Sequence, residues 1–249
     1  MNNETYYEMI FKRKSFHKFD EIKAVSEEEL KAIEEFLLNV TPLYDDIKVK
    51  TKIVKERETT CNRGAEYCVL FYSEKKDNYL HNVGYIGEQL DLFLTSMDIG
   101  TLWFGIGRPN EKTLDGLSYT IMIAFAKKPD GPWRRDMFAA KRKTMPEIWN
   151  GPEPEYANIV RFTPSACNSQ PWFVESSDKG LTIYRCRKPG KVGIMPIAMV
   201  PYYNKIDMGI FYCILEICMK HFGQDFDRKL YVDGEDSKLK TLNAEYIFK

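Results

Sequence analysis

The chain has 249 residues, and its 36 Lys and Arg residues balance 36 Asp and Glu residues, so its formal net charge is zero. A hydrophobic share of 44% and a charged share of 29% are typical of a folded globule and exclude a disordered chain. The neutral balance argues against a general nucleic-acid binder, which needs a basic excess.

The first half of the chain is predicted to alternate helices with buried strands. Ser26, followed three residues later by Glu29, resembles a capping box and predicts a helix that ends near Asn39. Apolar residues recur at helical spacing over 79–97, and Gly100 is expected to close that long helix in a left-handed conformation. Strands are predicted over 47–54, 66–72, 101–104 and 119–126.

The second half has a similar order of predicted elements. A helix is expected over 153–162, a second long helix over 205–222, and strands over 172–175, 181–185, 228–232 and 245–248. Helix, strand, strand, long helix, strand, strand therefore occurs twice, either by duplication or by chance among common elements. The sequence predicts an α+β fold with two domains, 1–140 and 141–249.

Cysteine usage and hydropathy both favour a cytoplasmic protein. The six cysteines form no CxxC pair and no zinc-spaced cluster, so reduced thiols are expected and no metal site. No uncharged apolar run approaches the ~20 residues that span a bilayer, and the N-terminus has no apolar signal segment.

A basic segment near the N-terminus could bind phosphate. Residues 11–19 place Arg13, Lys14, His17 and a Ser15 hydroxyl between aromatic residues, and forked or point-charge donors beside a neutral donor suit a phosphate. The alternative is a solvated basic surface.

A polar loop and a glycine-rich turn are the other two candidate segments. Residues 161–172 are fixed by two prolines and carry a dense set of donors and acceptors that suits a planar heterocycle, or they form an ordinary surface loop. Residues 98–107 contain Gly105 and Gly107, whose backbone N–H groups no side chain obstructs, or they form a buried strand with a glycine exit.

Together these segments resemble the nitroreductase family of flavin mononucleotide (FMN) enzymes. The family's Arg-x-Ser-x-Arg/Lys-x-Phe motif is similar to the segment from Arg13 to Phe19, with His17 where the family has a basic residue. The family's Pro-Ser-x-x-Asn-x-Gln-Pro-Trp loop is matched at every fixed position of 164–172. Gly100, Trp103 and Gly105 resemble the family's Gly-x-x-Trp-x-Gly turn.

The order of the motifs differs from an ordinary family subunit. There the Pro-Ser loop follows the Arg-x-Ser motif within a few dozen residues, whereas here residues 41–46 occupy that position and do not match. The ordinary enzyme is a homodimer whose two FMN sites each draw on both subunits. The chain therefore resembles a single-chain branch of the family, a pseudo-dimer in which each half keeps one side of one FMN site.

The resemblance implies a role for each matched residue. Arg13, Lys14 and Ser15 would bind the FMN phosphate, Lys141 and Lys143 would close that phosphate site, and His17 would lie near the flavin pyrimidine. The residues that would contact the ring system are Trp103, Phe104 and Gly105 at the turn near flavin N5, and Pro164, Ser165, Ala166, Cys167, Asn168 and Gln170 in the loop.

The implied activity is a ping-pong FMN-dependent NAD(P)H oxidoreductase. NADH or NADPH would supply hydride to flavin N5, and a small acceptor such as a nitroaromatic or a quinone would remove it. No side-chain acid or base is essential in this scheme, so no catalytic residue is named. The alternative is a flavin-binding protein without significant turnover, such as a redox sensor or a flavin store.

Overall fold

The computed structural model describes residues 1–187, 192–234, 236 and 238–249, and it divides the chain into two compact units. Unit 1 comprises Met1–Tyr79 and Ile86–Arg135, and unit 2 comprises Leu80–Tyr85 and Asp136–Lys249. The chain thus passes from unit 1 to unit 2 after Arg135, and the domain boundary at 140/141 stays a prediction from the sequence.

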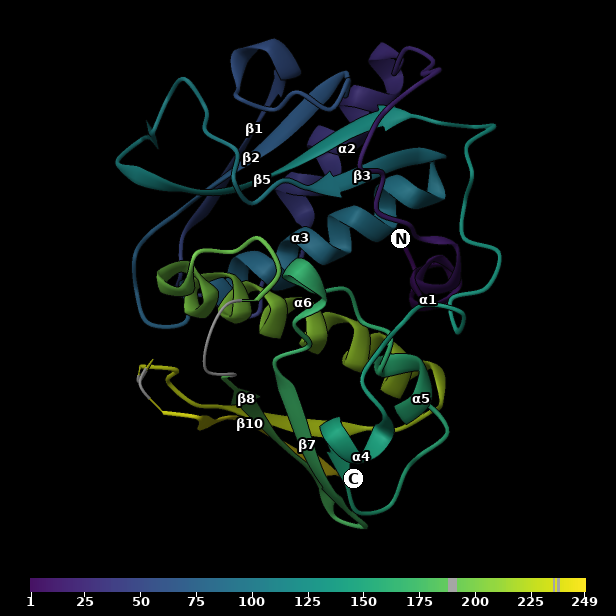
Figure 1. Ribbon diagram of the computed structural model, residues 1–249, viewed down its shortest axis with the longest axis vertical. Coiled ribbons are helices and arrows are strands. Elements are labelled where there is room, and N and C mark those ends of the chain that lie inside the picture. The colour runs from purple at the N-terminus through teal and green to yellow at the C-terminus, as the bar shows by residue number, and fades with distance from the viewer. Residues whose placement is uncertain (188–191, 235, 237) are drawn as a thin grey trace. The chain divides into compact units, whose positions relative to one another are not determined.

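Unit 1 contains an antiparallel sheet in the order β1-β2-β5-β3, and the long helix α3 runs along one face of it (Figure 1). The α3 helix contacts β3 closely, because a Cβ on Gly87 would lie 2.3 Å from the Trp103 ring. The elements are α1 (Asn3–Lys12), α2 (Glu27–Asn39), β1 (Val49–Lys55), the 3-10 turn η1 (Glu56–Glu58), β2 (Tyr67–Ser73), α3 (Tyr79–Ser96), β3 (Ile99–Trp103), β4 (Thr113–Leu114) and β5 (Leu117–Lys127).

The predicted helices and strands of unit 1 are confirmed to within a few residues, but α1 and the two-residue strand β4 were not predicted and the end of α3 was misassigned. Ser26 and Glu29 form the expected capping box of α2. The α1 helix was not predicted, although the Asn2 side chain caps it by accepting from the Thr5 N–H at 2.9 Å. Gly100 does not close α3, because Asp98 takes the left-handed conformation (φ 57°) and Gly100 lies inside β3.

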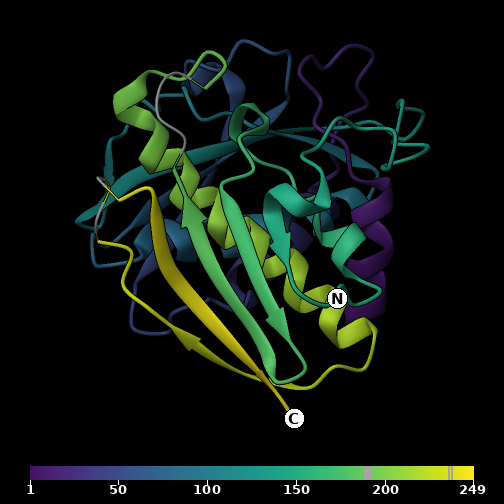
Figure 2. The same ribbon diagram turned by 60° about the horizontal axis from the view of Figure 1, so that its bottom comes forward.

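Unit 2 contains a second sheet in the order β6-β7-β8-β10-β9, and α6 packs against β8 on one of its faces (Figure 2). All neighbours in this sheet are antiparallel except β6 and β7. The elements are α4 (Met145–Ile148), β6 (Trp149–Asn150), α5 (Ala157–Val160), the 3-10 turn η2 (Ala166–Asn168), β7 (Trp172–Ser177), β8 (Gly180–Cys186), the 3-10 turn η3 (Ile197–Met199), α6 (Val200–His221), β9 (Phe226–Leu230) and β10 (Lys240–Phe248).

The two units share one topology. Apart from the two-residue strands β4 and β6, each unit has two antiparallel strands, then a long helix and two further strands. The last strand lies between the second and the third, giving β1-β2-β5-β3 and β7-β8-β10-β9. The repeated element order predicted from the sequence is therefore confirmed for the strands and long helices. A shared connectivity of this length favours duplication over chance.

Two helix predictions in the second half need correction. The helix expected over 153–162 is only the single turn α5, because Pro152 and Pro154 precede it and the chain ends the turn at Arg161. The second long helix begins at Val200 rather than Lys205, with Pro201 in its first turn, where a missing N–H costs nothing. None of the helices among the described residues combines the length and the apolar character of a bilayer-spanning segment.

Candidate functional site

The basic segment of unit 1 follows α1 and alternates between the interior and the surface. Arg13, Phe16 and Phe19 are buried, while Lys14 and Ser15 are half-buried and His17 is exposed. The two phenylalanines anchor the segment in the apolar core of the unit, and the Phe16 N–H donates to the Thr101 carbonyl at 2.9 Å. Lys14 and Ser15 are therefore presented beside β3 on an anchored backbone.

Arg13 lies in a buried ion pair. Its Nε is 2.6 Å from a carboxylate oxygen of Asp91 and 3.5 Å from Glu88, and all three residues are at most 5% exposed. Burial alone would lower the pKa of Arg13, but the two carboxyl groups outweigh it and raise that pKa. Arg13 thus already has an anionic partner, and its contact with a phosphate stays a prediction.

Asp91, which the sequence analysis did not select, joins the basic segment to the glycine turn. Besides pairing with Arg13, its carboxylate accepts from the Thr101 hydroxyl at 2.5 Å and from the Trp103 indole N–H at 3.2 Å. One buried carboxylate on α3 therefore fixes Arg13 and Trp103, which the sequence assigned to two separate motifs. An acid between Leu90 and Leu92, in the apolar stretch of α3, was the available signal.

The turn after β3 runs from Phe104 to Gly107. The Phe104 N–H donates to the Met122 carbonyl at 2.9 Å, and the Gly107 N–H donates to the Phe104 carbonyl at 3.0 Å. Gly105 lies between them and is half-buried. The backbone of this turn is therefore fixed at both ends, and the donation from the Trp103–Gly105 turn to flavin N5 stays a prediction.

The 164–172 loop of unit 2 has an unusual backbone. Cys167, Asn168 and Gln170 all have positive φ values, of 49°, 56° and 45°, a region that non-glycine residues adopt at a conformational cost. Ser165 stabilises the turn, because its hydroxyl oxygen accepts from the Gln170 N–H at 3.0 Å. The loop is a strained, internally bonded structure rather than a loose connection.

Asp207 on α6 holds this loop by hydrogen bonds. Like Asp91, it is not among the residues selected from the sequence. Its carboxylate accepts from the Ala166 N–H at 2.8 Å and from the Ser169 hydroxyl at 3.0 Å, and Asp207 is 2% exposed. Burial raises its pKa to about 7, although both hydrogen bonds oppose the shift. Its position between Ile206 and Met208 in an apolar helix was the signal that could have found it.

The structure also brings the basic pair 141 and 143 to the loop. The side-chain carbonyl of Gln170 accepts from the Lys143 N–H at 2.9 Å, and the Asn168 amide donates to the Lys141 carbonyl at 3.1 Å. The Lys143 ammonium donates to the Gln170 carbonyl. Gln170 is 2% exposed, so it clamps the two segments together from inside, while the Lys141 side chain is exposed.

Cys167 is exposed at the tip of the loop and contacts a neighbouring segment. A Cβ on Gly193 would lie 2.8 Å from the Cys167 Cβ, and Gly193 itself has a φ of 54°. Pro164, Ser165 and Ala166 are half-buried on the same loop. The loop residues named from the sequence therefore share one surface of unit 2.

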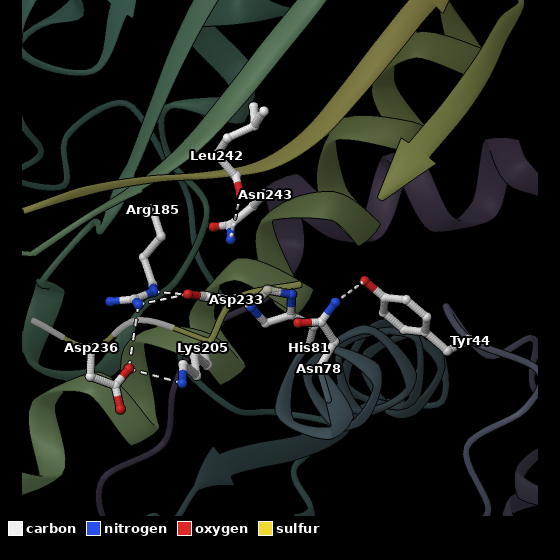
Figure 3. Close-up of polar contacts among 9 residues, drawn as sticks. All are labelled: Tyr44, Asn78, His81, Arg185, Lys205, Asp233, Asp236, Leu242 and Asn243. Atoms are coloured by element: carbon white, nitrogen blue, oxygen red, sulfur yellow. Dashed lines mark hydrogen bonds and ion pairs between the residues drawn. The ribbon is translucent and has the colours of Figure 1, made fainter. Parts of the chain in front are cut away.

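Unit 2 holds a second buried charge cluster, which Figure 3 shows. Asp233 accepts two hydrogen bonds from Arg185, at 2.6 and 2.7 Å, and lies 3.2 Å from the His81 ring nitrogen Nε2. Asp236 extends the cluster to Lys205 at 2.9 Å. Burial lowers the pKa of His81, so its imidazole is neutral and the cluster acts as a structural ion pair.

Known proteins resemble this chain both in sequence and in fold. The family model described as "Putative TM nitroreductase" matches residues 5–219. The crystal structure of the "putative nitroreductase" of Thermotoga maritima MSB8 is 20% identical and superposes with a TM-score of 0.63, covering 100% of this chain and 94% of that chain. A search of curated protein sequences found no match.

Two further solved structures show weaker similarity. A nitroreductase family protein of Clostridium difficile 630 is 14% identical, with a TM-score of 0.47 over 59% of this chain and 96% of that chain. A nitroreductase of Desulfitobacterium hafniense DCB-2, solved with bound FMN, is also 14% identical, with a TM-score of 0.41 over 58% of this chain and 100% of that chain.

Proposed function

Because the chain belongs to the nitroreductase family, with a family model matching residues 5–219, we propose that it is an FMN-dependent NAD(P)H oxidoreductase. The observation that carries the proposal is the 164–172 loop, which matches the family motif at every fixed position and is held in one strained conformation by Asp207, Ser165 and Gln170. A loop held in this way offers preorganised donors and acceptors to a planar ring.

The residues of unit 1 fit the phosphate end of such a cofactor. Lys14 and Ser15 are half-buried on a backbone that Phe16 and Phe19 anchor, so one fixed segment carries both an ammonium and a hydroxyl. These are donors that recognise a phosphate. The Lys14 ammonium donates to the Pro132 carbonyl at 3.0 Å. Arg13, paired with Asp91, would act through the local potential and through the position of the segment rather than as an unshared donor.

The residues of unit 2 fit the ring end. Pro164, Ser165, Ala166 and Cys167 present a small, partly polar surface, and their backbone cannot relax while Asp207 and Gln170 hold the loop. The resemblance assigned Lys141 and Lys143 to the phosphate site, but Asn168 and Gln170 hold their backbone beside this loop, so we propose that their positive charge serves the ring end instead. A cation near the flavin pyrimidine stabilises the anionic reduced ring.

Bound FMN would supply the hydride chemistry, and this chain would supply binding and orientation. In this scheme Lys14 and Ser15 hold the phosphate, the 164–172 loop excludes water from the ring, and the turn at Gly105 orients the edge of the ring that exchanges hydride. NADH or NADPH would be the donor and a small nitroaromatic or quinone the acceptor. No proton transfer is assigned to a side chain.

The proposal is tested by the absorbance of the purified protein and by anaerobic mixing with NADH or NADPH. We expect a yellow protein that saturates at one FMN per chain and whose flavin bleaches within seconds. A bound flavin that stays oxidised with both donors would instead identify a flavin-binding protein without turnover. A colourless protein that FMN does not stabilise, or saturation at two FMN per chain, would contradict the proposal.

Replacing Lys14 is expected to weaken the binding of FMN but not that of riboflavin, because only FMN carries a phosphate. Lys14→Ala should weaken FMN about tenfold or more, the equivalent of a charge-assisted hydrogen bond of roughly 1.5–3 kcal/mol, and should leave riboflavin almost unchanged. Fluorescence titration with both flavins measures the effect. Lys18→Ala is the matched control, since Lys18 is exposed and pairs with Asp20. An equal loss for both flavins would place Lys14 away from the phosphate.

A further inference from the structure

We propose that Asp207 is the positioning residue of the flavin site: by accepting two hydrogen bonds from the 164–172 loop, it fixes the loop conformation on which FMN binding depends. The inference rests on the proposed function for its ligand. It adds a residue that lies on α6, outside every motif that the sequence shares with the family.

The loop needs an anchor because its conformation is costly. Cys167, Asn168 and Gln170 are non-glycine residues with positive φ, and two of them are adjacent. Such conformations persist only where the surrounding structure over-determines them. Without external contacts, a loop of this composition would relax towards ordinary backbone conformations, and the surface that it presents would be lost.

Asp207 supplies external contacts on both sides of Cys167. It bonds the backbone N–H of Ala166, one residue before the first strained position, and the hydroxyl of Ser169, between the second and the third. Ala166 and Ser169 are three residues apart, and both bond the same carboxylate. The two bonds therefore define the curvature of the segment between them. Gln170 holds the far end of the same segment through Lys143.

Keeping a carboxylate at this position costs the folded protein stability. Asp207 is 2% exposed, and burial raises its pKa to about 7, so above that pH the folded state carries a buried charge that the unfolded chain leaves in water. A residue that served only to stabilise α6 would be better replaced by an apolar one. The carboxylate is explained by the loop that it holds, because its cost in stability is offset by a function that needs the loop in one conformation.

The experiment compares three variants at pH 8. Asp207→Ala removes both acceptors, and Asp207→Asn keeps an oxygen for the Ala166 N–H. Glu216→Gln is the matched control, a 4% exposed acid on the same helix that bonds Tyr85, Tyr246 and Arg228 rather than the loop. FMN affinity and the melting temperature are measured for each variant.

We expect Asp207→Ala to weaken FMN at least tenfold, and Asp207→Asn to remain within about threefold of the wild type. The melting temperature of Asp207→Ala should fall no further than that of Glu216→Gln, whose FMN affinity should be unchanged. An affinity within twofold of the wild type for Asp207→Ala would overturn the proposal. So would a loss of affinity that follows the melting temperature across all three variants.

A second readout needs no flavin and keeps this test separate from that of the proposed function. Cys167 is exposed between the two hydrogen-bonded residues, so its rate of alkylation by iodoacetamide in the flavin-free protein reports the conformation of the loop. We expect Asp207→Ala to raise the rate several-fold and Glu216→Gln to leave it unchanged. A rate that does not respond refutes Asp207 as the anchor. If alkylation is faster in Asp207→Ala but the wild-type protein does not bind FMN, Asp207 anchors the loop and its role in a flavin site is refuted.

Discussion

Replacing Asp233 with alanine is expected to lower the free energy of unfolding by roughly 3–5 kcal/mol, because it leaves a buried guanidinium without its counter-charge. Arg185 is 0% exposed and donates two hydrogen bonds to Asp233 (Figure 3). Its remaining nitrogen, Nη1, has no hydrogen-bond partner among the described residues. Asp236 approaches only to 3.4 Å and is half exposed, so it cannot replace Asp233.

A double variant tests this explanation. If the loss comes from the stranded charge, Asp233→Ala combined with Arg185→Leu should be less destabilised than Asp233→Ala alone, since a buried pair can be replaced by apolar residues at little cost. Urea unfolding curves give both values. Asp227→Ala is the control, because its pair with Lys249 is exposed to solvent, which screens the interaction. Additive losses in the double variant would contradict the stranded-charge explanation.

The same ion pair predicts acid sensitivity. Burial alone would raise the pKa of Asp233, but hydrogen bonds from His81 and Arg185 outweigh burial and lower that pKa below its usual range. A carboxyl group whose pKa is lower in the folded state contributes stability above the pKa of the unfolded chain, near 4, and loses it as the pH falls further. The difference in stability between the wild type and Asp233→Ala should therefore shrink in acid.

The regular elements were predictable because local signals agreed with the tertiary structure. The Ser26 capping box and the apolar periodicity of the two long helices are local, and they placed α2, α3 and α6. The α1 helix was missed because its hydrophobic face is weak and only Ile10 is buried. Gly100 was misassigned because glycine serves equally as a helix end or as a point of close approach, and here the Phe16 ring lies 2.8 Å from where a Cβ would be.

Of the candidate site, the sequence predicted the residues that would face a ligand but not the buried acids that hold them in place. Motif matching selected the residues that would face a ligand, such as Ser15 and Ser165. It could not select Asp91 or Asp207, whose partners lie 10 to 78 residues away along the chain. In the sequence, an acid between apolar neighbours is equally compatible with an exposed position at the edge of the helix. Only the packing of α3 on β3, and of α6 beneath the loop, shows that these carboxylates are buried.

Glu88 is expected to make the stability of the protein fall as the pH rises towards 9. Glu88 is 0% exposed, and neither carboxyl oxygen has a hydrogen-bond partner within the described part of the chain. Burial raises its pKa to about 8, although the charge of Arg13 opposes the shift. The folded state therefore keeps a proton that the unfolded chain releases near pH 4.5, so this contribution to stability is complete below that pH and is lost through pH 8.

The variant Glu88→Gln has no charge to bury, so its stability should exceed that of the wild type by an amount that grows from pH 5 to pH 9. The full difference is on the order of 5 kcal/mol, since the pKa of Glu88 rises from 4.5 to about 8 and each unit of pKa shift corresponds to about 1.4 kcal/mol. Thermal unfolding at a series of pH values measures it, and Glu34→Gln on the exposed face of α2 is the control for the loss of one negative charge. Parallel pH profiles for the wild type and Glu88→Gln would show that Glu88 ionises normally. A difference that grows between about pH 5 and pH 8 and then levels off would instead identify Glu88 as a carboxyl group that the fold keeps protonated beside Arg13.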